Sequence, residues 1–277
     1  MQSMRDVFFL TSGVMKAPTF AVRPSWFINP LSVTRLANTV AVCVCDDGDL
    51  VLVDVGWSAA QCEDPARVLG RARAASLGLV VTSEDSLLMQ LRRLGFSADR
   101  VKAIIATHLH LDHVGGVEDF PNAEVICADR ELRSYAHFDP AYRVADLARA
   151  GRLRPLPLEG IQGFDDAVDP FGDGFLRLFG LFGHSRGSLA VIIDAPTWLF
   201  VHIGDAVYQT WEYAQPGTSI LARFTAWRRS DLEHGHQRLR ALQADACSPM
   251  LVPSHDLDVF HGLPQVPSTL LSEAPRS

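Results

Sequence analysis

The sequence predicts an α/β protein on three observations. Apolar segments with strand composition alternate with segments of helical periodicity, as in residues 83–94 followed by residues 99–106. Four of the apolar segments end in imidazole or carboxylate side chains. Hydrophobic residues make up 48% of the 277 residues and charged residues 21%, an ordinary composition for a soluble globular protein. Because loops at the carboxyl ends of strands build the sites of α/β proteins, the pattern also predicts where the site lies.

The first quarter of the chain is predicted to contain three strands. Residues 6–14 form the first, and residues 16–36 are expected to be irregular because three prolines interrupt them. Residues 39–45 and 50–55 are expected to pair, since the Asp-Asp-Gly that follows the first of them is a hairpin-turn sequence. Residues 64–77, rich in alanine and arginine, are expected to form a surface helix.

The later elements continue the alternation. Residues 83–94 place leucines at helical spacing and are followed by a glycine, which predicts a helix. Further strands are predicted at residues 123–128, 175–181, 189–194, 198–203 and 250–253, and helices at 117–120, 129–136 and 231–244. Residues 140–174 contain many prolines and glycines, which predicts only short or irregular elements.

The segment from residue 104 to residue 116 contains a cluster of candidate metal-binding residues. An apolar strand is followed by three histidines and one aspartate within six residues, and then by a glycine pair. In an extended chain His108, His110 and Asp112 share one side, while the leucines between them enter the core. His113 breaks the alternation, which predicts a turn. Imidazole and carboxylate are ligands of Zn²⁺ and other first-row metals, and burying so many histidines is costly unless something binds them.

Residues 108–113, His-Leu-His-Leu-Asp-His, resemble the H-x-H-x-D-H signature of the metallo-β-lactamase superfamily. The resemblance implies an αββα sandwich with two mixed sheets, helices outside and the metals at one edge. It also implies a single domain that spans residues 1–277. Asp54, in an Asp-x-Gly sequence after a predicted strand, is expected to support the metal loop from behind.

Three later positions match the rest of the superfamily pattern, each after an apolar strand. They are His184, Asp205 and His255. The implied cofactors are two divalent metal ions, expected to be Zn²⁺. The resemblance implies that one ion is held by His108, His110 and His184, the other by Asp112, His113 and His255, and that Asp205 bridges them. Two such ions, roughly 3.5–4 Å apart, hold a bridging hydroxide of lowered pKa, which is the implied nucleophile.

Tyr208, three positions after Asp205, narrows the expected substrate. A tyrosine with this spacing resembles that of the N-acyl-homoserine lactone lactonases of the superfamily, the quorum-quenching type, in which its hydroxyl bonds the lactone carbonyl. The implied reaction is lactone ring opening, with Asp112 carrying a proton to the leaving oxygen. The irregular stretch with Trp26 and Phe27 is expected to grip the apolar acyl tail; a plain loop over the core is the alternative.

Two positions depart from the lactonase pattern, and other activities stay open. Ser188 stands where a second histidine is common, and Arg186 where proline is usual, so Arg186 is expected to reshape the pocket. A phosphodiesterase, a phosphotriesterase or another lactone or ester hydrolase would use nearly the same ligands. A glyoxalase II-type thioesterase, an exported β-lactamase, an RNA-processing enzyme and a non-catalytic metal-binding module fit the sequence less well.

Net charge, apolar runs and cysteine content limit the partners and the location that can be expected. A net charge of −7 disfavours nucleic acid and anionic membranes, leaving a small-molecule substrate. The N-terminal apolar run is too short for a signal peptide and no stretch reaches transmembrane length, so a cytoplasmic location is expected. The five cysteines are expected to be reduced core thiols. The oligomeric state is left open, with a homodimer as one alternative.

The other histidines are given no metal role. His202 is expected to be a packed core residue, and His234 and His236 to be solvated on a polar helix. His137 and His261 belong to no motif.

Overall fold

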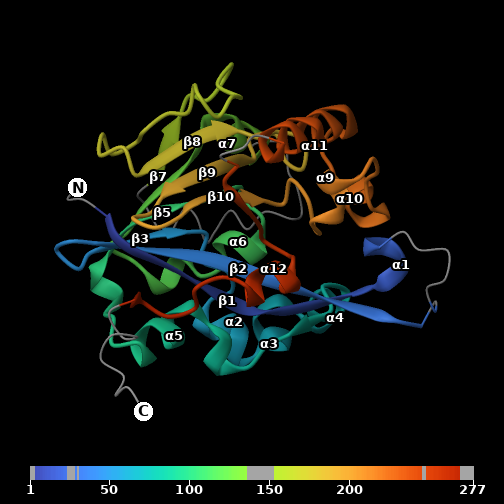
Figure 1. Cartoon of the computed structure of the whole chain (residues 1–277). Coiled ribbons are helices and arrows are strands. Elements are labelled where there is room, and N and C mark those ends of the chain that lie inside the picture. The colour runs from blue at the N-terminus through green and yellow to red at the C-terminus, as the bar shows by residue number, and fades with distance from the viewer. Residues whose placement is uncertain (1–3, 24–28, 30, 136–152, 245–247, 269–277) are drawn as a thin grey trace, which may run out of the picture.

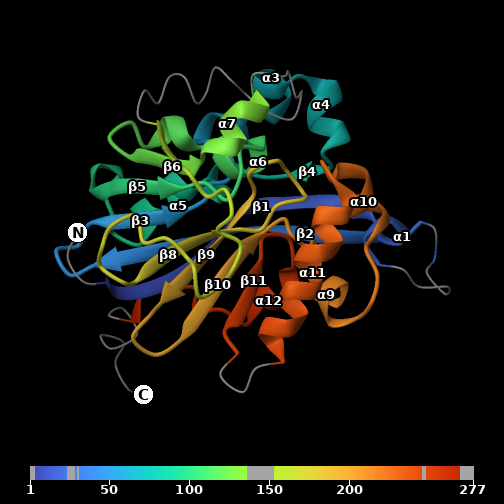
Figure 2. The ribbon, with the colours of Figure 1, turned by 90° about the horizontal axis from the view of Figure 1, so that it is seen from above.

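Two β-sheets lie face to face, with helices on both outer faces (Figure 1, Figure 2). The computed structural model describes residues 4–23, 29, 31–135, 153–244 and 248–268. In Figure 1 the helices α2, α3, α4 and α5 lie below the sheets and α11 lies above them. The predicted αββα sandwich is therefore confirmed.

The larger sheet has the strand order β4-β1-β2-β3-β5-β6-β7. Its strands are β1 (Met4–Pro18), β2 (Val33–Cys45), β3 (Leu50–Val53), β4 (Leu79–Val80), β5 (Val101–Ile105), β6 (Glu124–Ala128) and β7 (Leu153–Leu156). The strands from β4 to β3 pair antiparallel, and β3, β5, β6 and β7 pair parallel. Parallel strands end at the same edge of a sheet, which puts the residues after β5 beside those after β3.

The smaller sheet has the strand order β11-β10-β9-β8. Its strands are β8 (Leu176–Gly180), β9 (Leu189–Asp194), β10 (Leu199–Gly204) and β11 (Met250–Pro253). Strand β10 pairs antiparallel with β9 and parallel with β11. The last residues of β10 and β11 therefore reach the same edge of this sheet.

Alternation along the strands explains the layers. Phe9 and Ile105 face the smaller sheet, where the ring of Phe9 lies 5.0 Å from that of Phe200. Phe8 and Ile104, their chain neighbours, face the other way and belong to a separate cluster that contains residues of α5. A third cluster covers the outer face of the smaller sheet and includes a leucine of α11. Successive strand residues point to opposite faces, so each sheet needs apolar cover on both sides.

The helices and 3₁₀ turns complete the outer layers. The helices are α1 (Thr19–Val22), α2 (Ala59–Glu63), α3 (Pro65–Leu69), α4 (Arg71–Ser76), α5 (Leu87–Arg93), α6 (Leu111–Val114), α7 (Asp129–Tyr135), α9 (Trp211–Ala214), α10 (Ile220–Thr225), α11 (Arg229–Gln243) and α12 (Leu257–His261). The 3₁₀ turns are η1 (Ser83–Asp85), η2 (Ala98–Arg100) and η3 (Val117–Asp119). Among the described residues, no helix is long and apolar enough to cross a lipid bilayer.

The predicted irregular stretch at residues 16–36 was partly wrong. Strand β1 continues to Pro18 and β2 begins at Val33, and these two residues pair. Pro18 ends its strand, where a missing backbone N–H costs little. Trp26 and Phe27, assigned to the acyl tail, lie outside the described residues.

Two predicted helices are broken in the structure. Residues 64–77 form α3 and α4, because Gly70 takes a φ of +84° between them. Residues 83–94 form η1 and α5, because Ser86 caps the new helix by accepting from the backbone N–H of Met89. In both cases a local capping preference ended the helix within the predicted segment.

The remaining histidines divide as follows. His202 is buried and its Nε2 lies 3.2 Å from the carbonyl oxygen of Thr39, which confirms it as a core residue. His234 is exposed as predicted, but His236 is buried, with Nε2 2.7 Å from the carbonyl oxygen of Ala206. The solvated assignment of His236 was wrong because that face of α11 packs inward. His137 lies outside the described residues, as does one cysteine; the other four are buried free thiols.

Candidate metal centre

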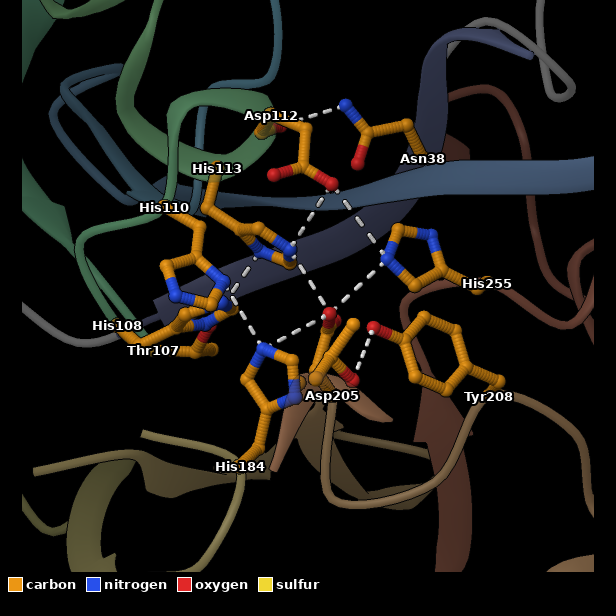
Figure 3. A network of polar contacts seen from close by, with 12 residues as sticks. Asn38, Thr107, His108, His110, Asp112, His113, His184, Asp205, Tyr208 and His255 are labelled. Atoms are coloured by element: carbon orange, nitrogen blue, oxygen red, sulfur yellow. Dashed lines mark hydrogen bonds and ion pairs between the residues drawn. The ribbon is translucent and has the colours of Figure 1, made fainter. Parts of the chain in front are cut away.

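Seven side chains meet where the ends of the two sheets come together (Figure 3). The larger sheet contributes four of them from the segment after β5, and the smaller sheet contributes three from the segments after β8, β10 and β11. They are His108, His110, Asp112, His113, His184, Asp205 and His255. The structure thus brings together all seven residues of the predicted ligand set.

The first group consists of three histidines. One ring nitrogen each of His108, His110 and His184 lies within 4.8 Å of the others. Nε2 of His184 and Nδ1 of His110 are 2.9 Å apart. Nε2 of His108 is buried and has no hydrogen-bond partner among the described residues. Three ring nitrogens are therefore directed at one point.

The second group contains two histidines and two carboxylates. Asp205 places Oδ1 3.1 Å from Nε2 of His113 and Oδ2 3.1 Å from Nε2 of His255. The same Oδ2 is 3.4 Å from Nε2 of His184, which belongs to the first group. Oδ2 of Asp112 lies 3.6 Å from Nε2 of His255. Asp205 therefore contacts residues of both groups.

These residues fit divalent metal ions. Buried polar groups are normally hydrogen-bonded, yet Nε2 of His113 and Oδ1 of Asp205, although 3.1 Å apart, form no hydrogen bond of ordinary geometry with each other or with another described residue. Both atoms point into the cluster. Imidazole nitrogen and carboxylate oxygen are accepted ligands of Zn²⁺, and paired metal sites use such mixed sets.

The electrostatics of the cluster also suit cations. Burial and the neighbouring imidazoles lower the pKa of His108 well below its usual value, and burial lowers that of His184 to about 3. Burial opposes ionisation of Asp205, but His255, His113 and His184 outweigh it and hold its pKa well below the usual range. Neutral imidazole and ionised carboxylate are the forms that bind metals.

His113 and His255 behave differently. Burial disfavours their charged forms, but Asp205 and Asp112 outweigh burial and raise the pKa of both rings. The carboxylates therefore favour protons on these rings in the metal-free protein. A divalent cation would replace those protons, so metal binding is expected to release them.

Asp54 supports the cluster from behind. Its Oδ1 accepts a 2.8 Å hydrogen bond from the backbone N–H of Thr107, and its Oδ2 lies 2.8 Å from Nδ1 of His113. Its φ is +60°, a value that non-glycine residues rarely adopt. This backbone conformation directs the carboxylate toward His113, and its contact with Nδ1 fixes the orientation of the ring.

The local geometry of the motif differs from the prediction. The extended segment was expected to reach Asp112, but α6 begins at Leu111, so Asp112 and His113 extend from a helical turn. Leu109 and Leu111 are buried as predicted. The prediction failed because the turn starts two residues earlier than the break in alternation suggested.

Tyr208 lies beside both groups. Its ring stacks on that of His255, with centroids 5.1 Å apart and planes at 10°, and its hydroxyl is 3.2 Å from Oγ1 of Thr225. Burial raises the pKa of Tyr208 well above its usual value, so the phenol stays neutral and able to donate. A cavity of about 450 Å³ contacts Tyr208, Asp112 and Asp205.

Sequence comparison identifies the family. A profile of the metallo-beta-lactamase superfamily matches residues 34–212. The chain belongs to the metallo-beta-lactamase superfamily. The recognition made from residues 108–113 is thereby confirmed.

Among the relatives, a probable metallo-hydrolase of Mycobacterium tuberculosis is 34% identical over 191 residues, which are 65% of this chain. The match spans 60% of that relative's length. The N-acyl homoserine lactonase AttM of Rhizobium radiobacter is 32% identical over 199 residues, 68% of this chain and 70% of AttM. A solved N-acyl homoserine lactone hydrolase with N-hexanoyl-L-homoserine bound at its catalytic metal center superposes with a TM-score of 0.74. It covers 95% of this chain and 97% of its own at 18% identity, a likeness of fold.

Contacts in the structure hold both residues that depart from the expected lactonase pattern. Ser188 donates a 2.8 Å hydrogen bond to the carbonyl oxygen of Leu181 and so closes the loop that carries His184. The guanidinium of Arg186 lies 4.0 Å above the ring of Trp227 and is not among the residues that line the cavity. The expectation that Arg186 reshapes the pocket was wrong, because its stacking on Trp227 holds it elsewhere.

The sequence did not reveal the apolar wall of the cavity. It is formed mainly by Met15, Ala17, Leu36, Trp57, Leu77 and Leu221. Met15 and Ala17 alternate with exposed residues on β1, a period-two signal within a stretch interpreted as irregular. Phe20, within the same stretch, is half-exposed on α1 and is absent from this wall.

Proposed function

We propose that this metallo-hydrolase opens the lactone ring of N-acyl-homoserine lactones with two bound metal ions. The observation that carries the proposal is the position of Tyr208, whose neutral hydroxyl borders the same cavity as Asp112 and Asp205. The identity to AttM over about two thirds of the chain supports the substrate class.

The proposed ligands follow the two groups of side chains. One ion is assigned to His108, His110 and His184, the other to Asp112, His113 and His255, with Asp205 shared. Zn²⁺ is proposed because these ligands are nitrogen and carboxylate oxygen. When bound, the ions supply Lewis acidity and a coordinated water whose pKa falls to about 7.

The protein's own groups orient and protonate the substrate. Tyr208 is proposed to donate a hydrogen bond to the lactone carbonyl oxygen, where negative charge develops. Asp112 is half-buried and borders the cavity, so its carboxylate is proposed to take the proton that the attacking water loses and to deliver it to the ring oxygen as that oxygen leaves.

The apolar wall is proposed to bind the acyl tail. It lies in the same cavity as Tyr208 and includes Leu36, Trp57 and Leu221. Burying each methylene of a tail against such a wall contributes about 0.8 kcal/mol. Trp26 and Phe27 stay predictions for the same role.

The test is substrate competition on metal-loaded protein, followed by proton release. Short- and long-chain N-acyl-homoserine lactones are compared with an unsubstituted γ-lactone, a phosphotriester, a phosphodiester and a β-lactam. We expect the acyl-homoserine lactones to give the highest kcat/KM, and a chelator to abolish turnover. Preference for a phosphoester, or no turnover of any lactone, would overturn the substrate assignment and leave the metallo-hydrolase family unaffected.

A further inference from the structure

We propose that Glu131, on α7, is a positioning residue that holds together the two loops bearing the first group of histidines. Its side chain is fully buried. Oε1 accepts a 3.1 Å hydrogen bond from the backbone N–H of Leu109. Oε2 accepts one of 2.8 Å from the hydroxyl of Ser185 and one of 2.7 Å from the backbone N–H of Gly187.

The donors flank every member of the group. Leu109 stands between His108 and His110 in the chain, and Ser185 directly follows His184. The first loop follows β5 of the larger sheet and the second follows β8 of the smaller sheet. One carboxylate therefore joins two loops that follow strands of different sheets.

His184 is the histidine whose position depends most on the Glu131 carboxylate. Nδ1 of His113 is held by Asp54, and Nδ1 of His255 lies 2.7 Å from the carbonyl oxygen of Ala37. Nδ1 of His184, in contrast, is buried and has no hydrogen-bond partner among the residues described. Metal-binding histidines are normally oriented through the second ring nitrogen. The ring of His184 is instead oriented through its backbone, which Glu131 holds at the next residues.

Close packing between α7 and the loop that carries His184 also limits movement of that loop. A side chain at Gly187 would collide with the backbone nitrogen of Glu131, so the loop packs directly against α7. Hydrogen bonds to an ionised carboxylate are also stronger than those between neutral groups. The loop therefore has little freedom to move His184 away from the other two histidines.

Glu212 provides a matched control. It too is fully buried, and it accepts from the backbone N–H groups of Tyr208, Gln209 and Ser219 at 2.6, 3.1 and 2.8 Å. None of these donors neighbours a histidine of the first group in the chain. Losing either carboxylate should cost stability, but only Glu131 should affect the first group.

The experiment titrates metal-free protein with Zn²⁺ or Co²⁺ against a chromophoric chelator. It compares wild type, Glu131→Gln and Glu212→Gln, and His184→Ala identifies the binding step that belongs to the first group. Glutamine keeps one acceptor oxygen, but its amide nitrogen cannot accept, so the hydrogen bonds to one of the two loops are lost. We expect Glu131→Gln to weaken the His184 step about 10- to 100-fold and to leave the other step unchanged. Glu212→Gln should leave the His184 step unchanged.

The inference rests on the proposed two-metal centre and not on the lactone assignment. Wild-type protein that binds less than one equivalent would overturn the metal centre and this inference together. Two wild-type steps that Glu131→Gln leaves unchanged, or weakens equally, would overturn the inference alone. Gly187→Ala should weaken the same step by pushing the loop from α7, and it decides the matter should Glu131→Gln not fold.

Discussion

The hydroxyl of Tyr208 lies 3.2 Å from Oγ1 of Thr225, and that oxygen lies 3.0 Å from the carbonyl oxygen of Leu221. Thr225 donates its only hydroxyl proton to that carbonyl. Its oxygen is therefore the acceptor of the hydrogen bond from the Tyr208 hydroxyl. A lactone carbonyl bound as proposed would therefore replace Thr225 as the acceptor of this hydrogen bond. Exchanging one hydrogen bond for another costs little free energy, so the hydroxyl is held in place and still available.

Tyr208→Phe is expected to lower kcat for lactones about 100-fold, as loss of one donor to an oxyanion typically does. Steady-state kinetics at matched metal content measure this. Thr225→Val is the control, because it removes the competing acceptor and keeps the Tyr208 hydroxyl; it should not lower kcat. Equal activity of Tyr208→Phe and wild type would exclude Tyr208 from the reaction.

Asp205→Asn is expected to reduce the metal content from two equivalents to one or fewer. Asp205 faces His113, His184 and His255 with its two oxygens, and an amide nitrogen cannot bind a cation. Elemental analysis after dialysis measures the content. Asp258→Asn, an exposed carboxylate paired with Arg23, is the matched control and should retain both ions. Full metal content in Asp205→Asn would refute the shared position.

Asp54→Asn is expected to lower metal affinity about 10- to 100-fold, since groups that orient metal-binding histidines typically have this effect. Asparagine tolerates the φ of +60° at this position, so the backbone should be retained. The lost interaction is the ion pair with Nδ1 of His113. Zn²⁺ titration measures the change, and unchanged affinity would show that His113 is oriented by other contacts.

Asp119→Asn is expected to stabilise the metal-free protein above about pH 6. Burial raises the pKa of Asp119 to about 6 from 3.8, while the backbone N–H of Ala59 opposes the shift. The folded state thus binds this proton more tightly than the unfolded state. The resulting stability is full below pH 3.8 and is lost as the pH rises through about 6.

At neutral pH the neutral amide avoids the cost of burying a charge. Because Asp119 is partly exposed, we expect a gain of about 1–2 kcal/mol at pH 8 and little difference at pH 4. Thermal unfolding of both proteins across this range, with chelator present, measures it. A stability difference that does not grow with pH would mean that folding does not raise the pKa of Asp119.

The sequence was most informative at the ends of buried strands. His184, Asp205 and His255 could be found because each follows an apolar run and matches a superfamily position. It was least informative where distant segments decide the environment. His236 is buried by contact with the segment after Asp205, and Arg186 is held by Trp227, neither of which periodicity reveals.

The fold was predicted in class and in most strands, and the errors have local causes. Prolines suggested that the chain becomes irregular after residue 14, yet Pro18 is accommodated at the end of β1. Capping by Ser86 and the backbone of Gly70 divided two helices whose apolar spacing ran on. Hydrogen bonds at these points outweigh periodicity, which a count of apolar residues does not detect.

The ligand set joins the segment after β5 to segments far later in the chain, the last of them after β11. Closing such distant contacts costs more chain entropy than closing local ones, so we expect them to form late in folding. Metal ions bound there would stabilise the native state but not the folding transition state. They would therefore slow unfolding and leave the folding rate almost unchanged. The centre between the sheets would then determine how long each folded molecule lasts as well as what it hydrolyses.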